Sequence, residues 1–221
     1  MFDRRAFMAT GSAFAALAAN GCAPAGGVVT GTRPSTTGLA FGRLQPDPAG
    51  LIDLPEGFSY SIISQLGDMM SDGLTVPDRA DGMGCFALPG GLIALVRNHE
   101  LRPEHDPGGA LPAGYDAKGA APLPGGTTTL WLDPQTLEVK RQFRSLTGTI
   151  RNCAGGVTPW GTWLTCEEDT TKQGNGLSRD HGYVFEVPAA ATGPVEAVPL
   201  AAMGRFNHEA AAVDPASGIV Y

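Results

Sequence analysis

The chain has 221 residues, enough for one sizeable domain or two small ones, and its 43% hydrophobic and 17% charged residues are typical of a globular protein. Its 31 glycines and 18 prolines favour turns and short strands over long helices. A net charge of −7 argues against nucleic-acid binding, which needs a basic face. An anionic substrate would therefore need an arginine or a bound cation.

Residues 1–25 have the pattern of an export signal. Arg4 and Arg5 precede a short alanine-rich apolar run and a tail of small residues. The paired arginines are typical of twin-arginine export, and the apolar run is too short for a stable membrane span. Lipid attachment at Cys22 is an alternative to simple cleavage. We predict a periplasmic or secreted protein whose partner during export is the twin-arginine machinery.

The rest of the chain predicts an extended arm followed by a β domain. Residues 26–50 are rich in Gly, Pro, Ser and Thr and predict a linker or arm, whereas residues 51–221 carry strand signals. Two Asp-Pro pairs, at 133–134 and 214–215, predict turns between strands. The alanines of 200–212 leave that segment ambiguous between helix and strand. The predicted strand segments are 57–66, 90–100, 127–146, 161–168, 181–188 and 208–221.

The spacing of these strands is typical of a sandwich, a barrel or a propeller. The repeated strand–turn–strand unit favours a propeller, and so does the tripeptide Asn-His-Glu, which occurs at 98–100 and again at 207–209. Equivalent strand ends of successive propeller blades meet at a central channel. We therefore predict an all-β fold of the propeller type, incomplete in this chain; a small complete β domain is the alternative.

Carboxylates follow several predicted strands. Glu100, Glu167, Glu168 and Glu209 each lie at a strand end, where they form either a solvated turn or a set of hard oxygen ligands for Ca²⁺ or Mg²⁺. Because side chains alternate along a strand, Glu167 and Glu168 are expected to face different surroundings.

Three cysteines remain after Cys22, so at least one of them is unpaired. Cys153 and Cys166 are the nearest pair for a disulfide. Cys153 lies in the segment RNCAGGVTPWG, which we interpret as a loop that holds either a buried structural thiol or a thiolate ligand for a transition metal such as iron or zinc. Cys166 is expected to be a packed thiol.

The basic residues beside the tripeptides allow several roles. Arg97 and Arg205 lie just before them and are candidates for holding an anion or for forming a salt bridge. His99 and His208 are metal ligands, donors to a ligand, or satisfied core histidines. There is no phosphate-binding P-loop and no serine nucleophile motif.

Several segments, RNHE, GGTTTLWLD, SLTGTIRNCAGGVTPWGTWLTCEED, HGYVFEV and GRFNHEAAAVDPASGIVY, together resemble the PhoX family of exported bacterial alkaline phosphatases. The resemblance runs from about residue 55 to the end of the chain. It implies a six-bladed β-propeller that holds iron (Fe³⁺) and calcium and hydrolyses small phosphate esters outside the cytoplasm. Proteins of this family are much longer than this chain, so we expect an N-terminal part of such a propeller, and a monomer.

The resemblance also assigns the candidate metal ligands. Cys153 would be the thiolate bound to iron and Glu209 a further iron ligand, while Glu167 and Glu168 would supply oxygens to calcium or to bridging positions. Glu100 and Asn98 would lie at the mouth of the site.

Asn98, Arg97 and His208 are the candidate catalytic residues. The implied reaction is phosphoryl transfer to water assisted by metal ions. Two alternatives are a secreted, non-catalytic propeller that calcium stabilises and that binds a partner, and a propeller oxidoreductase with an organic cofactor.

Overall fold

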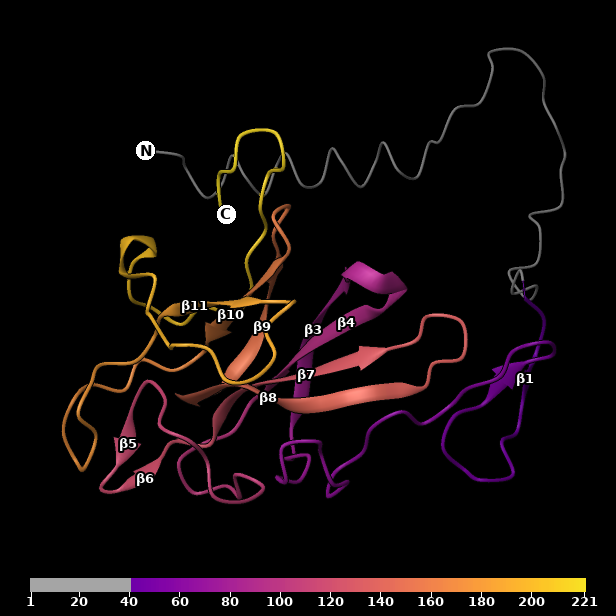
Figure 1. The fold of residues 1–221 in the computed structure, drawn as a ribbon, viewed down its shortest axis with the longest axis horizontal. Helices are drawn as coiled ribbons and strands as arrows, with labels where there is room; N and C mark the ends of the chain where they lie inside the picture. Colours follow the sequence, from indigo (N-terminus) through magenta and orange to yellow (C-terminus); the bar gives the residue numbers. More distant parts are fainter. Residues whose placement is uncertain (1–40) are drawn as a thin grey trace, which may run out of the picture. The chain divides into compact units, whose positions relative to one another are not determined.

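The computed structural model describes residues 41–221, which form two separate compact units, 41–60 and 61–221 (Figure 1). The predicted signal peptide, Cys22 and the first part of the predicted arm lie outside the described residues. The boundary predicted at residue 50 falls inside the first unit and stays a prediction.

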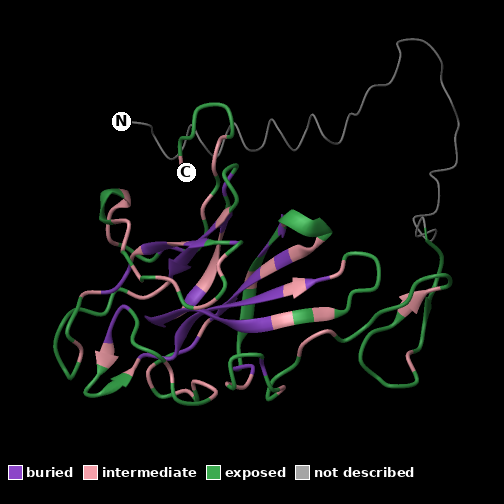
Figure 2. Ribbon diagram, viewed as in Figure 1, coloured by how far each residue is buried: buried purple, intermediate pink, exposed green. Residues whose placement is uncertain are grey.

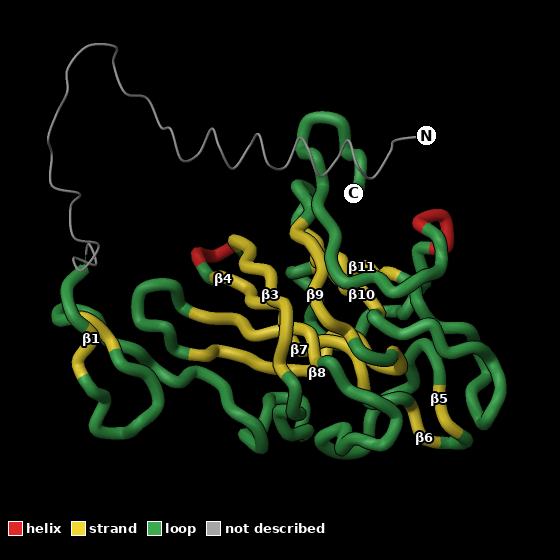
Figure 3. Tube along the Cα trace, turned by 180° about the vertical axis from the view of Figure 1, so that it is seen from behind, coloured by secondary structure: helices red, strands yellow, loops and turns green. Residues whose placement is uncertain are grey.

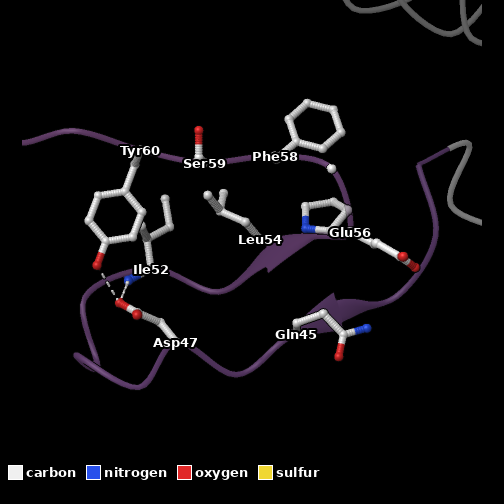
Figure 4. Close-up of a pocket in the computed structure, with 10 residues that line it drawn as sticks. Gln45, Asp47, Ile52, Leu54, Glu56, Phe58, Ser59 and Tyr60 are labelled. Carbon is white, nitrogen blue, oxygen red and sulfur yellow. Dashed lines mark hydrogen bonds between the residues drawn. The ribbon is translucent and has the colours of Figure 1, made fainter.

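The first unit is a loop closed by one carboxylate. Strand β1 (Leu44–Gln45) pairs antiparallel with β2 (Leu54–Pro55). Between them, Asp47 accepts hydrogen bonds from backbone N–H groups within 49–52 and from the hydroxyl of Tyr60 at 2.6 Å (Figure 4). The bond from Tyr60, followed by the backbone bonds, lowers the pKa of Asp47 to about 2.

The second unit begins with a four-stranded antiparallel sheet whose strands follow the chain order β3-β4-β7-β8. Its strands are β3 (Ala80–Ala87), β4 (Ile93–His99), β7 (Gly125–Leu132) and β8 (Val139–Thr149). Between β3 and β4 lies a 3₁₀ turn, η1 (Pro89–Gly91). Between β4 and β7 lies a short hairpin formed by β5 (Ala117–Lys118) and β6 (Ala121–Pro122).

A three-stranded antiparallel sheet follows, in the order β11-β10-β9. Its strands are β9 (Asn152–Val157), β10 (Thr162–Glu167) and β11 (Val184–Pro188). A second 3₁₀ turn, η2 (Ala201–Met203), comes next. The fold is therefore all-β, and none of the antiparallel sheets formed by residues 41–221 closes on itself.

Most predicted strands are present. β4, β7, β8, β10 and β11 occupy the segments predicted for them. The turn at Asp133 forms as its chemistry predicts, because its carboxylate accepts the N–H groups of Gln135 and Thr136. Around Asp214 the turn also forms, and Ala212 and Tyr221 on its flanks exchange backbone hydrogen bonds, but the flanks form an isolated bridge instead of two strands.

The strand predicted at 57–66 is wrong. Its alternating pattern suggested a half-buried strand, yet Phe58 and Ile62 are more than half exposed, and the segment has no strand partner among the described residues. An alternating pattern specifies a strand only where a neighbouring strand and a core are available to it.

Strands β3 and β9 were not predicted, and glycine explains both omissions. A Cβ on Gly155 would collide with the carbonyl oxygen of Leu164, and a Cβ on Gly82 would lie 2.6 Å from the Cα of Ala154. Glycine in a strand permits such close backbone approach, although it weakens the strand signal. The segment interpreted as a loop around Cys153 is therefore a strand packed closely against β3, and the two are neighbours in both Figure 1 and Figure 3.

The two sheets share a hydrophobic core, and buried positions are most frequent on β4, β7, β8 and β10 (Figure 2). Phe86 and Val96 of the first sheet lie in one cluster with Trp163 and Phe185 of the second. Burial of these large apolar side chains is the main force that joins the sheets.

Asn98 connects the sheets within this core. Its side chain is fully buried, and its Nδ2 donates to the carbonyl oxygens of Cys153 at 3.0 Å and Ala154 at 2.8 Å. Its Oδ1 accepts from the indole N–H of Trp163 at 2.9 Å and the hydroxyl of Thr165 at 2.8 Å. All four hydrogen-bonding positions of the amide are occupied, and they join β4 to β9 and β10.

We expect the substitution Asn98→Ala to destabilise the protein by about 3 kcal/mol or more, because it leaves several buried donors and acceptors without partners. The midpoint of urea unfolding measures this loss. The matched control is Asn207→Ala in the second Asn-His-Glu tripeptide, where the residue is exposed and should lose little. Equal losses in the two variants would contradict the role given to Asn98.

Candidate functional site

The candidate site surrounds the thiol of Cys153. Burial and then the negative charges of Asp81, Glu168, Glu100 and Glu209 raise the pKa of this thiol to about 11. The thiol is half-buried, while Asp81 and Glu209 are exposed. Negative charges close to a thiol disfavour its thiolate, so this thiol stays protonated at neutral pH unless a cation offsets the carboxylates.

These residues come from strands and strand ends of both sheets. Asp81 is on β3, and Glu100 follows β4 of the first sheet; Cys153 is on β9, and Glu168 follows β10 of the second. The C-terminal segment adds Glu209, whose carbonyl oxygen accepts the N–H of Ala154 at 3.0 Å. Four of the five predicted metal ligands therefore belong to one electrostatic cluster around the thiol, and Asp81 belongs to it without having been predicted.

Arg151 links the carboxylates of the two sheets. Its guanidinium Nη2 lies 2.6 Å from Oε1 of Glu100 and 2.8 Å from Oε2 of Glu168. Its backbone N–H donates to the carbonyl oxygen of Leu101, and its carbonyl accepts the N–H of Glu168. The residue has a φ of 49°, a left-handed conformation that costs free energy for a non-glycine residue. The contacts on both sides of Arg151 hold it in this conformation.

Glu167, the fifth predicted ligand, points into the protein interior. Its fully buried carboxylate accepts the N–H of Ile150 at 2.9 Å, the N–H of Gly182 at 2.8 Å and the N–H of Tyr183 at 3.2 Å. It also lies 2.7 Å from Nδ1 of His181. Glu167 and Glu168 therefore occupy different surroundings, as strand alternation predicts, and only Glu168 lies near the thiol.

A buried chain of ionisable groups extends from Glu167. His181 lies between Glu167 and Asp116, with its Nε2 3.3 Å from a carboxylate oxygen of Asp116. Burial acts to lower the pKa of His181, but hydrogen bonds to Glu167 and Asp116 outweigh it and raise that pKa. A charged histidine between two carboxylates interacts favourably with both of them within the core.

The candidate catalytic residues do not all lie near Cys153. The side chain of Asn98 contacts the backbone of Cys153 and is fully satisfied there. Arg97 donates to the hydroxyls of Ser64 and Thr128, which belong to the opposite face of its sheet. The ring of His208 stacks on Phe206 with centroids 3.6 Å apart.

His99 and Arg205 have other partners. Both nitrogens of His99 are bonded, one to the carbonyl oxygen of Asp78 and one to the hydroxyl of Thr128, so it is a satisfied core histidine. Arg205 donates to the carbonyl oxygen of Thr170.

All three cysteines within the described residues are free thiols, so Cys153 and Cys166 do not form the disulfide considered above. Cys166 is fully buried beside Leu164 and Val184 and is the packed thiol that we expected.

A pocket opens beside the cluster, with a volume of about 350 Å³. Its lining is polar and comprises Arg151, Glu168, Asp169, Thr170, Thr171 and Asn207. It could admit a small polar ligand next to the carboxylate that Arg151 holds.

A family model described as "Alkaline phosphatase PhoX" matches the chain twice, over residues 39–133 and 126–221. The chain belongs to the PhoX family of alkaline phosphatases. No significant match exists among curated proteins or solved structures. The two PhoX matches overlap within β7, and together they include both sheets and every residue of the Cys153 cluster.

The donor set around Cys153 suits the metals that the PhoX resemblance implies, because a sulfur ligand favours iron and carboxylate oxygens favour calcium. Among residues 41–221, however, no group of three His, Cys, Asp or Glu side chains is close enough together to hold one ion. These residues therefore supply donors of the right chemistry without forming a complete coordination shell.

The helical turns among residues 41–221 include none with the length and the apolar sequence of a membrane-spanning segment.

Sequence reasoning missed four residues in or next to the candidate site. Asp81 lies on a strand that was not predicted. Arg151 lies just before Cys153 in the sequence, and no role was predicted for it. Asp116 and His181 act through Glu167. A glycine-rich context such as DGMGC around Asp81 is the one signal that could have indicated a close-packed inner strand.

The adjacent pair Glu167 and Glu168 gives a direct test of this geometry. Glu167→Gln places an amide donor against existing donors, so we expect it to destabilise the protein by about 2–4 kcal/mol. Glu168→Gln removes a partly exposed ion pair and should cost less than about 1 kcal/mol. Urea unfolding of both variants measures the difference; a larger loss in Glu168→Gln would show that the inward and outward roles are reversed.

Proposed function

We propose that this protein is an exported, metal-dependent alkaline phosphatase that transfers the phosphoryl group of small esters to water without a serine nucleophile. The observation that supports it best is the thiol of Cys153 surrounded by Glu100, Glu168 and Glu209, in a chain that the PhoX family model matches. Arg151 offsets the charges of Glu100 and Glu168, whereas Asp81 and Glu209 form no salt bridge among residues 41–221, and a bound cation would offset their charges and favour the thiolate.

The proposed centre contains iron (Fe³⁺) and calcium. Cys153 would bind iron together with Glu209, and Glu168 and Glu100 would offer oxygens to calcium; Asp81 is a further candidate oxygen donor. When bound, these ions would stabilise the charge on the phosphoryl oxygens and activate water. Glu167 is left out of this proposed ligand set because its oxygens already accept four hydrogen bonds from the protein.

The chain's own residues would arrange the site and receive the substrate. Arg151 fixes Glu100 relative to Glu168 across the sheets, and neither carboxylate uses more than one oxygen in its bonds to the guanidinium. The second oxygen of each therefore remains available to a metal. The positive charge of Arg151, which lines the pocket, would also attract an anionic ester in a protein of net charge −7.

We also propose that the two sheets are successive blades of a propeller, six-bladed by family resemblance. Each sheet is an antiparallel set of strands from consecutive parts of the chain, and the first strand of one, β3, packs on the first strand of the other, β9. Export by the twin-arginine route would carry the folded protein to the periplasm or the medium. The paired arginines near the N-terminus support this route.

The decisive experiment compares two thiol substitutions in the exported protein. Cys153→Ala should lose its iron and lower kcat/KM for p-nitrophenyl phosphate by about 100-fold or more. Cys85→Ala removes an exposed thiol and should keep both iron and activity. Elemental analysis and steady-state kinetics measure the two effects, and circular dichroism checks that each variant is folded.

Full iron content in Cys153→Ala would refute the thiolate ligand. If calcium stabilises the wild-type protein, but the protein holds no iron and hydrolyses no ester, the result would support the alternative of a non-catalytic propeller.

A further inference from the structure

A row of basic side chains crosses the face of the first sheet that lies opposite Asn98. Arg97 on β4 pairs in register with Thr128 on β7, and Thr128 pairs with Arg144 on β8. Paired residues on neighbouring strands point to the same face of a sheet, so the two arginines flank Thr128 with Cα atoms about 10 Å apart.

Both arginines are buried, and neither forms a salt bridge among the described residues. Arg144 is 0% exposed and Arg97 is 8% exposed. Among the described residues, Nε of Arg97 and both Nε and Nη1 of Arg144 have no hydrogen-bond partner. No carboxylate within this part of the chain forms a salt bridge with either guanidinium.

The bonds that these arginines do make are to neutral groups. Arg144 donates through Nη2 to the carbonyl oxygens of Pro107 at 2.8 Å and Pro124 at 3.0 Å. Asp72 is near, but its carboxylate accepts the backbone N–H of Arg144 at 2.7 Å instead of a guanidinium N–H. These bonds hold Nη2 of Arg144 and leave its Nε and Nη1 without hydrogen-bond partners in the described part of the chain.

Arg144 keeps its charge in the core. Burial lowers its pKa to about 10, with Asp72 acting in the opposite direction, and at that value the guanidinium is still charged at neutral pH. An unpaired buried charge destabilises the folded protein, and two in one row destabilise it more, unless an anion lies with them.

We propose that Arg97 and Arg144 bind a small inorganic anion in the layer over Thr128. The unpaired N–H groups of the two side chains are the donors, and the anion offsets their charges in the core. Guanidinium groups are suited to this role because they remain charged when buried and are weakly hydrated. The site lies on the face opposite the Cys153 cluster, and so this proposal does not depend on the proposed phosphatase activity.

The experiment follows the melting temperature of the natively purified full chain. Sodium bromide or sodium sulfate is titrated at constant ionic strength, with sodium gluconate as the balancing salt. We expect the melting temperature of the wild type to rise by about 5 °C or more at roughly 100 times the Kd, since a ligand that binds only the native state stabilises it.

Arg144→Met and Arg97→Met should each lose this rise. The matched control is Arg141→Met on the same strand, which removes an arginine that stacks on Phe143 and donates to a carbonyl oxygen at 2.6 Å; it should keep the rise. If an arginine variant does not fold, crystals of the wild type in bromide provide the test, with an anomalous peak between the two guanidinium groups. No anion-dependent rise, the same rise in all variants, or no bromide peak would overturn the proposal.

Discussion

The side-chain amide of Asn98 is the interaction on which the arrangement of the site depends. Its four hydrogen bonds hold the end of β4 against β9 and β10 within the core. Because Glu100 follows β4 directly and Cys153 lies on β9, the same bonds fix the distance between the carboxylate and the thiol. A fully satisfied buried network of this kind allows one register and disfavours others, because any slip would leave its polar groups unpaired.

Side chains alternate along a strand, so neighbouring residues at the strand ends point to different sides and have different partners. Glu167 points inward and binds three backbone N–H groups and His181, whereas Glu168 points outward to Arg151. Arg97 and Asn98 face opposite sides of their sheet in the same way. Each strand end thus contributes one side chain that fixes the backbone and one that is free for a ligand. The proposed metal site would use the outward set, and the proposed anion site lies behind it.

The sequence was a good guide to local structure and a weaker guide to side-chain direction. Apolar runs and Asp-Pro turns located β4, β7 and β8, because turn chemistry and burial act over a few residues. β9 was missed because its glycines reflect contacts with distant segments. The repeated Asn-His-Glu tripeptide was misleading for a similar reason: Asn98 is buried at the centre of the fold, and Asn207 is exposed. Family resemblance identified the cluster, but only tertiary contacts separate Glu167 from it.

The central claim is that the thiol of Cys153 and the carboxylates held around it form one metal centre. X-ray absorption at the iron edge of the natively purified protein tests this claim most directly, because it reports the atoms bound to iron whatever the activity of the sample. The account predicts one sulfur atom in the first shell at roughly 2.3 Å, as for other metal–thiolate bonds, together with oxygen ligands. A first shell of oxygen and nitrogen alone would contradict it.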